Sequence, residues 1–255
     1  MREGIEPSSQ INMTLEHLIL FLSLALLAEI LGTLGGFGSS MLFVPIAGLF
    51  LDFHSVLGVT ALFHLSSNTT KIYAFRKGFD KKLVASIGIP AVICVIIGGI
   101  ATRWINAATL ELSISVFLIV LSILLLAFRN FKLKPTPSNS IAGGAVSGFL
   151  AGIFGTGGAI RGLTLAAFHL EKNTFILTSA VIDLAIDSSR SVVYLFNGYI
   201  HGHDLYLVAY LFVIGITGTY IGKFILNYVS EEKFRSIVLI LTMATGAFAV
   251  FKILQ

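Results

Sequence analysis

The sequence is a series of long apolar stretches separated by short polar or glycine-containing breaks. A helix needs about 20 mostly apolar residues to cross a bilayer. The stretches form two sets of five: 15–34, 41–51, 56–75, 83–105 and 110–128, then 141–154, 159–168, 175–196, 205–226 and 237–251. The last three of each set are long enough to span, whereas 41–51 and 141–154 are too short to cross upright. The pattern predicts an all-α polytopic membrane protein with about five hydrophobic helices in each half.

Composition excludes the main classes of water-soluble protein. Only 12% of the residues are charged, against about 25% in a typical soluble domain, and the mean hydropathy is +0.92. A soluble enzyme, a nucleic-acid-binding protein and a disordered chain are therefore excluded, and the lipid bilayer is the expected surrounding medium. The single cysteine, Cys94, allows no internal disulfide. Residues 1–13 are expected to form a polar tail without an evident cleavable signal.

Glycines recur at a fixed spacing between the two sets of stretches. A shift of 120 residues places Gly32, Gly35 and Gly38 on Gly152, Gly155 and Gly158. The same shift places Gly78, Gly98 and Glu111 on Gly198, Gly218 and Glu231. Such matches over about a hundred residues indicate an internal duplication. The predicted organisation is a membrane repeat at 14–131, a linker at 132–140 and a second membrane repeat at 141–255, all within one membrane domain.

The loop cations predict that the two repeats cross the membrane in opposite directions. Cytoplasmic loops of membrane proteins carry an excess of Lys and Arg. The loop after the third stretch contains Arg76, Lys77, Lys81 and Lys82, whereas the matching loop at 197–204 contains neither residue type. Inverted repeats with an odd number of crossings place both termini outside. A full helical hairpin and a re-entrant one remain open for the first two stretches of each set, because both return to the same side.

A glycine cluster interrupts each short pair of stretches, at 35–38 and at 155–158. Amides freed from a helix inside the membrane must be covered by protein or line a cavity. Broken helices at equivalent positions of inverted halves indicate a transport site at the bilayer midplane. Helices that restart at Ser39 and Ala159 would direct free N–H groups toward it, which favours anions. The alternative is helix packing alone, a use indicated for Gly144, Gly148 and Gly152.

Polar side chains inside the predicted spans are the candidate site residues, because a charge at the bilayer centre costs at least about 2.5–3.5 kcal/mol. The predicted binding residues for a small anionic substrate are Arg161, Arg190, Lys71, Asn68, Ser39, Ser40, Thr156, Gly36, Gly38, Gly157 and Gly158. The predicted proton-coupling residues are Asp183, Asp187, Glu29 and His64. In the alternative interpretation the two aspartates only orient or neutralise Arg190, and Lys71 reaches the cytoplasmic surface.

The motif His201-Gly202-His203-Asp204 has a spacing typical of metal ligands, but no further ligand cluster accompanies it. A solvated turn is the favoured interpretation, so no metal and no other cofactor is predicted. An intramembrane enzyme is disfavoured because the chain lacks the motifs His-Glu-x-x-His, Gly-x-Gly-Asp and Gly-x-Ser-x-Gly. The favoured function is a secondary anion transporter working by alternating access, with no catalytic residues, and an anion channel is the main alternative.

The glycine clusters lie in two related motifs. They are Gly32-x-x-Gly-Gly-Phe-Gly-Ser-Ser-Met-Leu-Phe-Val-Pro45 and Gly148-Phe-Leu-Ala-Gly-Ile-Phe-Gly-Thr-Gly-Gly158, each followed some 40 residues later by a helix ending at a glycine. From about Leu18 to Leu254 the chain resembles the TauE/SafE family of membrane permeases. The resemblance implies a secondary carrier that exports small sulfur-containing anions, such as sulfite or organosulfonates, through the bacterial cytoplasmic membrane. A homodimer is one assembly that remains open.

Overall fold

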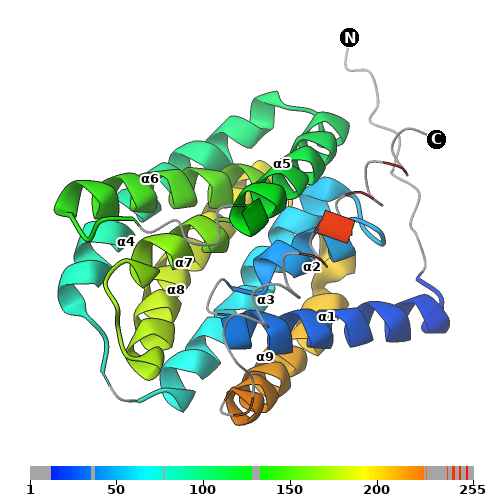
Figure 1. Ribbon diagram of the computed structural model, residues 1–255. Coiled ribbons are helices and arrows are strands. Elements are labelled where there is room, and N and C mark those ends of the chain that lie inside the picture. The colour runs from blue at the N-terminus through cyan, green and yellow to red at the C-terminus, as the bar shows by residue number, and fades with distance from the viewer. Residues whose placement is uncertain are drawn as a thin grey trace.

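The computed structural model describes residues 13–35, 38–76, 78–127 and 133–226, together with single positions after 226. Within these residues the chain is helical and has no strand, which confirms the all-α prediction (Figure 1). The α-helices are α1 (Leu15–Gly35), α2 (Ser40–Ala47), α3 (Phe53–Ala74), α4 (Lys81–Ala101), α5 (Ala107–Ala127), α6 (Pro137–Phe154), α7 (Gly158–Ala166), α8 (Lys172–Asn197) and α9 (Leu205–Ile225). Two 3₁₀ helices, η1 (Thr102–Trp104) and η2 (Gly202–Asp204), flank α4 and α9. The predicted stretch 237–251 lies largely outside the described residues.

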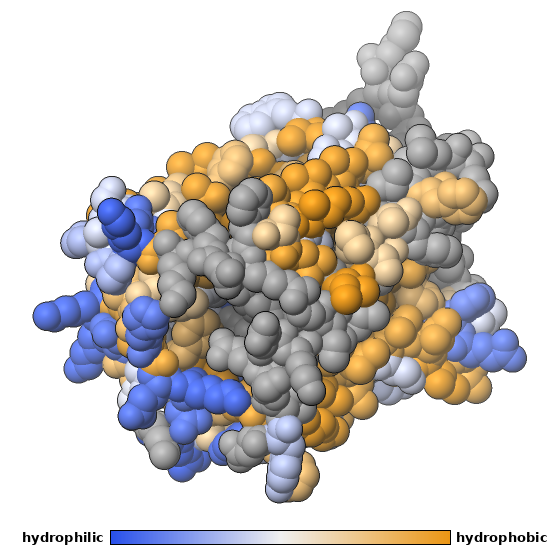
Figure 2. Space-filling view, viewed as in Figure 1, coloured by the Kyte–Doolittle hydropathy of each residue, from blue (hydrophilic) through white to orange (hydrophobic). Residues whose placement is uncertain are grey.

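Four of the described helical segments are long and apolar enough to cross a membrane. They are Leu15–Leu34, Lys81–Trp104, Ala107–Ala127 and Gly202–Ile225. Their outer faces carry large apolar side chains: on α4, Ile89, Ile93 and Ile97 recur one turn apart and are all more than half exposed. Figure 2 shows hydrophobic residues across most of the visible described surface, with hydrophilic residues gathered toward its edges. Such a surface suits lipid rather than water.

The helices α3 and α8 differ from these spans because they are long but too polar to qualify on composition. The sequence predicted spans here, at 56–75 and 175–196. The two helices pack against each other, with α9 against α3 and α4 against α8. Protein therefore surrounds much of their surface, and many of the polar side chains that lower their hydropathy are buried between helices.

The outer helices pack in two pairs, α1 with α9 and α4 with α6, on either side of the α3–α8 pair (Figure 1). Glycines bring α4 and α6 close together. A Cβ atom on Gly144, Gly148 or Gly152 would lie 2.1–2.3 Å from the backbone oxygen of Ile87, Ala91 or Val95, respectively. The packing use predicted for these three glycines is therefore present in the fold.

The short helices α2 and α7 follow α1 and α6 and contact them. Helix α6 begins at Pro137, four residues before the apolar stretch that predicted it and inside the predicted linker. Thr136 explains this start, because its side-chain oxygen accepts a hydrogen bond from the Asn139 N–H, and proline is favoured in the first helical turn. Residues 137–140 are therefore part of α6.

Candidate functional site

The two glycine breaks meet in the interior of the protein. The first separates α1 from α2 and the second separates α6 from α7, and the helices α2 and α7 are in contact. The hydroxyl oxygens of Ser40 and Thr156 lie 3.2 Å apart across this contact. Gly38 and Gly155 have φ angles of +79° and +72°, a region that disfavours every residue with a Cβ atom. The glycines therefore shape the turns that bring the two breaks together.

A small, largely polar cavity lies between the breaks and helices α3 and α8. Its lining includes most of the predicted site residues: Gly38, Ser39, Ser40, His64, Asn68, Gly157, Gly158, Arg161, Asp183, Asp187 and Arg190. Thr156 adjoins it through Ser40. Gly36 lies outside the described residues. The cavity combines two arginines, two aspartates and neutral hydrogen-bonding groups.

Arg161 reaches the cavity from the first turn of α7. Its side chain is only 2% exposed and forms an ion pair with Asp183 of α8. The Arg161 Nη2 also donates to Asp183 Oδ2, so both guanidinium nitrogens at the tip meet the carboxylate. The Arg161 Nε donates to Ser179 Oγ at 3.2 Å. The planar fork of donors that arginine would offer to an oxyanion is held here by a carboxylate.

Arg190 joins α8 to the second glycine break. Its Nη1 donates to the Gly155 carbonyl at 2.6 Å, which satisfies a backbone acceptor freed by the break. Its Nε lies 2.8 Å from Asp187 Oδ1. The other oxygen of Asp187 accepts a hydrogen bond of 2.7 Å from Asn68 Nδ2 on α3. Arg190 thus has a structural role at the break as well as a place in the cavity wall.

Glu29 of α1 is fully buried and is the centre of a second polar cluster. It pairs with Lys71 at 2.8 Å and accepts hydrogen bonds from Ser39 at 2.5 Å and Ser67 at 2.6 Å. Thr33 and Thr219 complete its set of donors at 3.1 Å. Lys71 is buried, so it does not extend to the surface; with Asn68 and Asp183 it lines a smaller cavity adjoining the first.

His64 connects this cluster to the arginines. Its Nδ1 lies 3.2 Å from Arg190 Nη2 and its Nε2 lies 2.8 Å from Ser39 Oγ. A guanidinium group can only donate, so Nδ1 accepts and a neutral His64 carries its proton on Nε2. His64 then donates to Ser39, and Ser39 donates to Glu29. A continuous chain of hydrogen bonds runs from Glu29 to Arg190.

The charges in and around the cavity balance. Among the residues that the structure describes, the buried lysine and arginines are Lys71, Arg161 and Arg190, and each pairs with its own carboxylate. An anion that entered alone would leave the cavity with an excess negative charge in a poorly screened environment. Binding of an anion in this cavity would therefore be electrostatically unfavourable unless one carboxylate became neutral.

Sequence reasoning missed several groups that complete the site. Ser179 and Ser67 precede Asp183 and Lys71 by one helical turn, a spacing that marks a shared helix face and could have identified them. The sequence could not identify the Gly155 carbonyl. Every residue carries a backbone oxygen, and only the fold shows which oxygen lacks a hydrogen bond within a helix.

Comparison with protein families gives one match that covers most of the chain. The model of the family described as "Sulfite exporter TauE/SafE" matches residues 21–249. The chain belongs to the TauE/SafE family. Comparisons with curated proteins and with solved structures give no match. Membership confirms the resemblance of the glycine motifs, and it identifies the chain as a membrane transport protein of a sulfite-exporting family rather than an enzyme.

Contact between the two glycine breaks can be tested by cross-linking in this TauE/SafE protein. The variant Ser40→Cys/Thr156→Cys, made with Cys94→Ser to remove the native thiol, is expected to form an intramolecular link with an oxidant or Hg²⁺. A protease site is inserted between residues 134 and 135. After cleavage, the two halves of the chain run separately on a gel unless the two cysteines are linked. The two single-cysteine variants are the controls, and separation of the halves in the treated double variant would contradict the contact.

Proposed function

We propose that this protein is a secondary carrier for a small sulfur oxyanion or organosulfonate, exporting it across the cytoplasmic membrane with both termini outside. The observation that carries this proposal is the meeting of the two glycine breaks around Arg161 and Arg190 in one buried cavity. Two interrupted helices with polar groups at a common point are the usual construction of a carrier site at the membrane midplane. Sulfite, the compound in the family description, presents oxygens that suit guanidinium donors.

The helix contacts support an arrangement of two related repeats. A shift of 120 residues takes α1, α2, α3 and α4 approximately onto α6, α7, α8 and α9. When each helix is replaced by its counterpart in the other repeat, the α1–α9 contact becomes the α6–α4 contact, and the α3–α9 contact becomes the α8–α4 contact. All four contacts are present in the structure. The α3–α8 contact is unchanged. We propose a twofold axis through the α3–α8 contact, so that rocking of one half against the other exposes the cavity alternately to each side.

Charge balance supports coupling of the anion to a proton. Anion binding to Arg161 or Arg190 displaces the paired carboxylate of Asp183 or Asp187, and protonation of that carboxylate restores neutrality. In the proposed cycle anion and proton move together through an electroneutral loaded state. The chain of hydrogen bonds through His64 and Ser39 to Glu29 offers a route for a proton, because His64 donates to Ser39 and Ser39 donates to the Glu29 carboxylate. Net direction is then set by the two concentration gradients.

The coupling predicts that an inward proton gradient drives accumulation of anion in proteoliposomes. Methanesulfonate is the suitable probe because it stays ionised, so no neutral acid crosses the lipid unaided. Acidifying the outside is expected to raise uptake above the equilibrium level, and a protonophore combined with a potassium clamp is expected to abolish that excess. Protein-free liposomes are the control. Accumulation driven by membrane potential alone would contradict proton coupling, and a measurable unitary conductance would favour the channel.

A further inference from the structure

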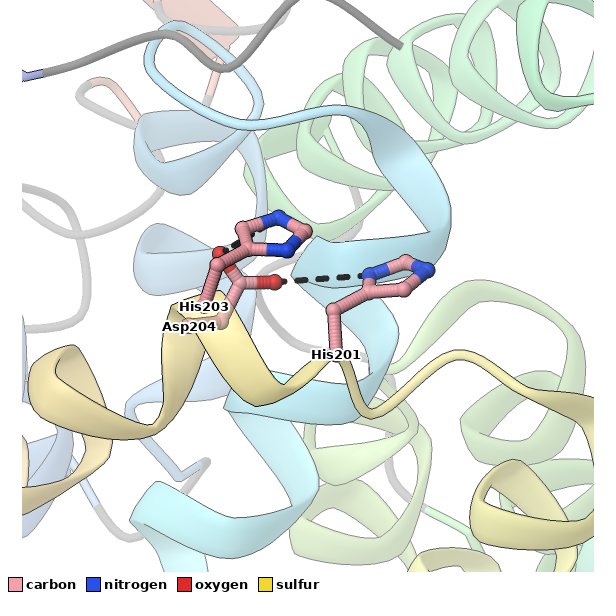
Figure 3. A group of neighbouring side chains, drawn as sticks. All are labelled: His201, His203 and Asp204. Atoms are coloured by element: carbon pink, nitrogen blue, oxygen red, sulfur yellow. Dashed lines mark ion pairs between the residues drawn. The ribbon is translucent and has the colours of Figure 1, made fainter. Parts of the chain in front are cut away.

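A second cluster of ionisable side chains lies in the connection between α8 and α9. It consists of His201, followed by His203 and Asp204 of η2 (Figure 3). The connection packs closely on the start of α3: a Cβ atom on Gly58 would lie 2.4 Å from the Tyr199 carbonyl oxygen. His201 Nδ1 also lies 2.8 Å from Ser55 Oγ. The cluster therefore sits on a packed part of the fold and not on a free loop.

The three side chains converge on one point. Figure 3 shows the Asp204 carboxylate between the two rings, with one oxygen directed at each of them. Asp204 Oδ2 lies 3.5 Å from His201 Nδ1, and Asp204 Oδ1 lies 3.4 Å from His203 Nε2. All the potential ligand atoms lie within 4.8 Å of one another. Zinc binds nitrogen and oxygen at about 2.0–2.2 Å, so tetrahedral ligands lie about 3.4 Å apart. Small movements of these side chains would bring the more widely spaced ligand atoms to that separation.

Asp204 gives an independent indication of a cation site. Its side chain is 7% exposed, and its Oδ2 is buried without a hydrogen-bond donor. Asp52 and Asp80, at the starts of α3 and α4, each accept two backbone N–H groups, whereas the side chain of Asp204, at the start of α9, accepts no capping hydrogen bond. A buried carboxylate oxygen without a donor is unfavourable unless a positive charge compensates it. The rings of His201 and His203, 36% and 55% exposed, can supply the remaining ligands.

We propose that His201, His203 and Asp204 bind a divalent transition-metal ion of the zinc class. Two imidazoles and a carboxylate form a recognised ligand set for such ions, with water in the open positions. The buried Asp204 fixes one ligand, and the more exposed rings close on the ion. Binding at His201 Nδ1 replaces its hydrogen bond to Ser55. The ion would bind within the α8–α9 connection, beside the start of α3, and this site is separate from the anion cavity.

Cobalt binding to the detergent-purified protein tests this site directly, after removal of any polyhistidine tag. Wild-type protein is expected to bind one Co²⁺ with the intense visible absorption of a low-coordinate site, and one equivalent of Zn²⁺ should displace it. Asp204→Asn, which keeps the shape of the side chain, and His203→Ala, at an exposed position, are both expected to weaken binding by more than about tenfold.

The control is His17→Ala, which removes an exposed histidine on α1 outside the cluster and should leave the spectrum unchanged. Circular dichroism and the elution volume verify that each variant is folded. Absence of stoichiometric Co²⁺ binding by the wild type would overturn the proposal, as would wild-type affinity in folded Asp204→Asn. Anion flux is measured separately, so failure of the metal site leaves the transport proposal unaffected.

Discussion

Neutralising one ion pair of the cavity, in the variant Arg161→Gln/Asp183→Asn, is expected to remove anion transport and leave the fold intact. Each charge-assisted hydrogen bond from an arginine contributes about 1.5–3 kcal/mol. A factor of ten corresponds to about 1.4 kcal/mol, so losing one or two such bonds to the anion lowers flux by about 10- to 100-fold or more. The measurement is methanesulfonate or sulfite flux in proteoliposomes.

The fold is expected to survive because both members of the pair change together. Removing one partner would leave a buried, uncompensated charge, whereas replacing a buried ion pair with neutral groups of similar shape is often close to neutral in stability. The amides of glutamine and asparagine can still hydrogen-bond to each other. The melting temperature in detergent is therefore expected to remain within a few degrees of the wild type.

Arg190 is a less suitable position for this test. It satisfies the Gly155 carbonyl and pairs with Asp187, so Arg190→Ala would leave two unpaired groups at the break and lose stability together with any binding. A matched control is Thr217→Val on α9, which alters an exposed hydroxyl bonded only to the backbone of its own helix. Wild-type flux in folded Arg161→Gln/Asp183→Asn would remove Arg161 from the mechanism.

The positions of the helices could be predicted from the sequence because two physical signals agreed. Apolar stretches, long or short, predicted the described helices, and the glycines at a shift of 120 residues predicted where they break. Gly38 and Gly155 illustrate the second signal, since both adopt positive φ angles in the breaks between paired helices. Helix boundaries were less accurate where capping decided them, as at Thr136 before α6.

The chemistry of the cavity could be predicted only in part. Buried charges stand out in an apolar sequence, so Arg161, Arg190 and the aspartates were identifiable as candidates. Their pairing was harder to predict, because Arg161 and Asp183 lie on different helices and their separation in sequence does not fix which carboxylate each arginine meets. Lys71 was predicted to bind the anion, with a position at the surface as the alternative; it is buried and pairs with Glu29, so the surface alternative is wrong and anion binding stays a prediction.

The motif at 201–204 shows that the spacing of residues in the sequence could not predict the burial of each side chain. His201 and His203 are partly exposed, as expected for a solvated turn, but Asp204 is buried beside them. Burial of that carboxylate follows from packing of the connection against α3, which involves residues more than 140 positions away in the sequence. A local pattern contains no information about such a contact.

The variant Gly148→Ala, in the interface between α4 and α6, is expected to lose the most stability. The new Cβ atom would lie 2.1 Å from the Ala91 carbonyl oxygen and 2.6 Å from its Cα, both of them backbone atoms that cannot rotate away. The two helices must separate by about an ångström, and inserting one methyl group into a tight interface costs about 1–3 kcal/mol or more. Close approach at small residues is also the main source of helix association in lipid.

Thermal unfolding in detergent measures this effect, with Gly88→Ala on α4 as the matched control. Gly88 is also a buried helix glycine, but its added Cβ would meet only the side chain of Ile182, at an ordinary contact distance of 3.7 Å. Alanine is the better helix former by about 1 kcal/mol, so Gly88→Ala is expected to equal or exceed wild-type stability. Gly148→Ala is expected to melt at least about 2 °C, and up to about 12 °C, below the wild type. Equal melting temperatures for the two variants would show that α4 and α6 do not pack through their backbones. Such a result would also weaken the carrier mechanism, because α4 and α6 hold α8 and the second break in place.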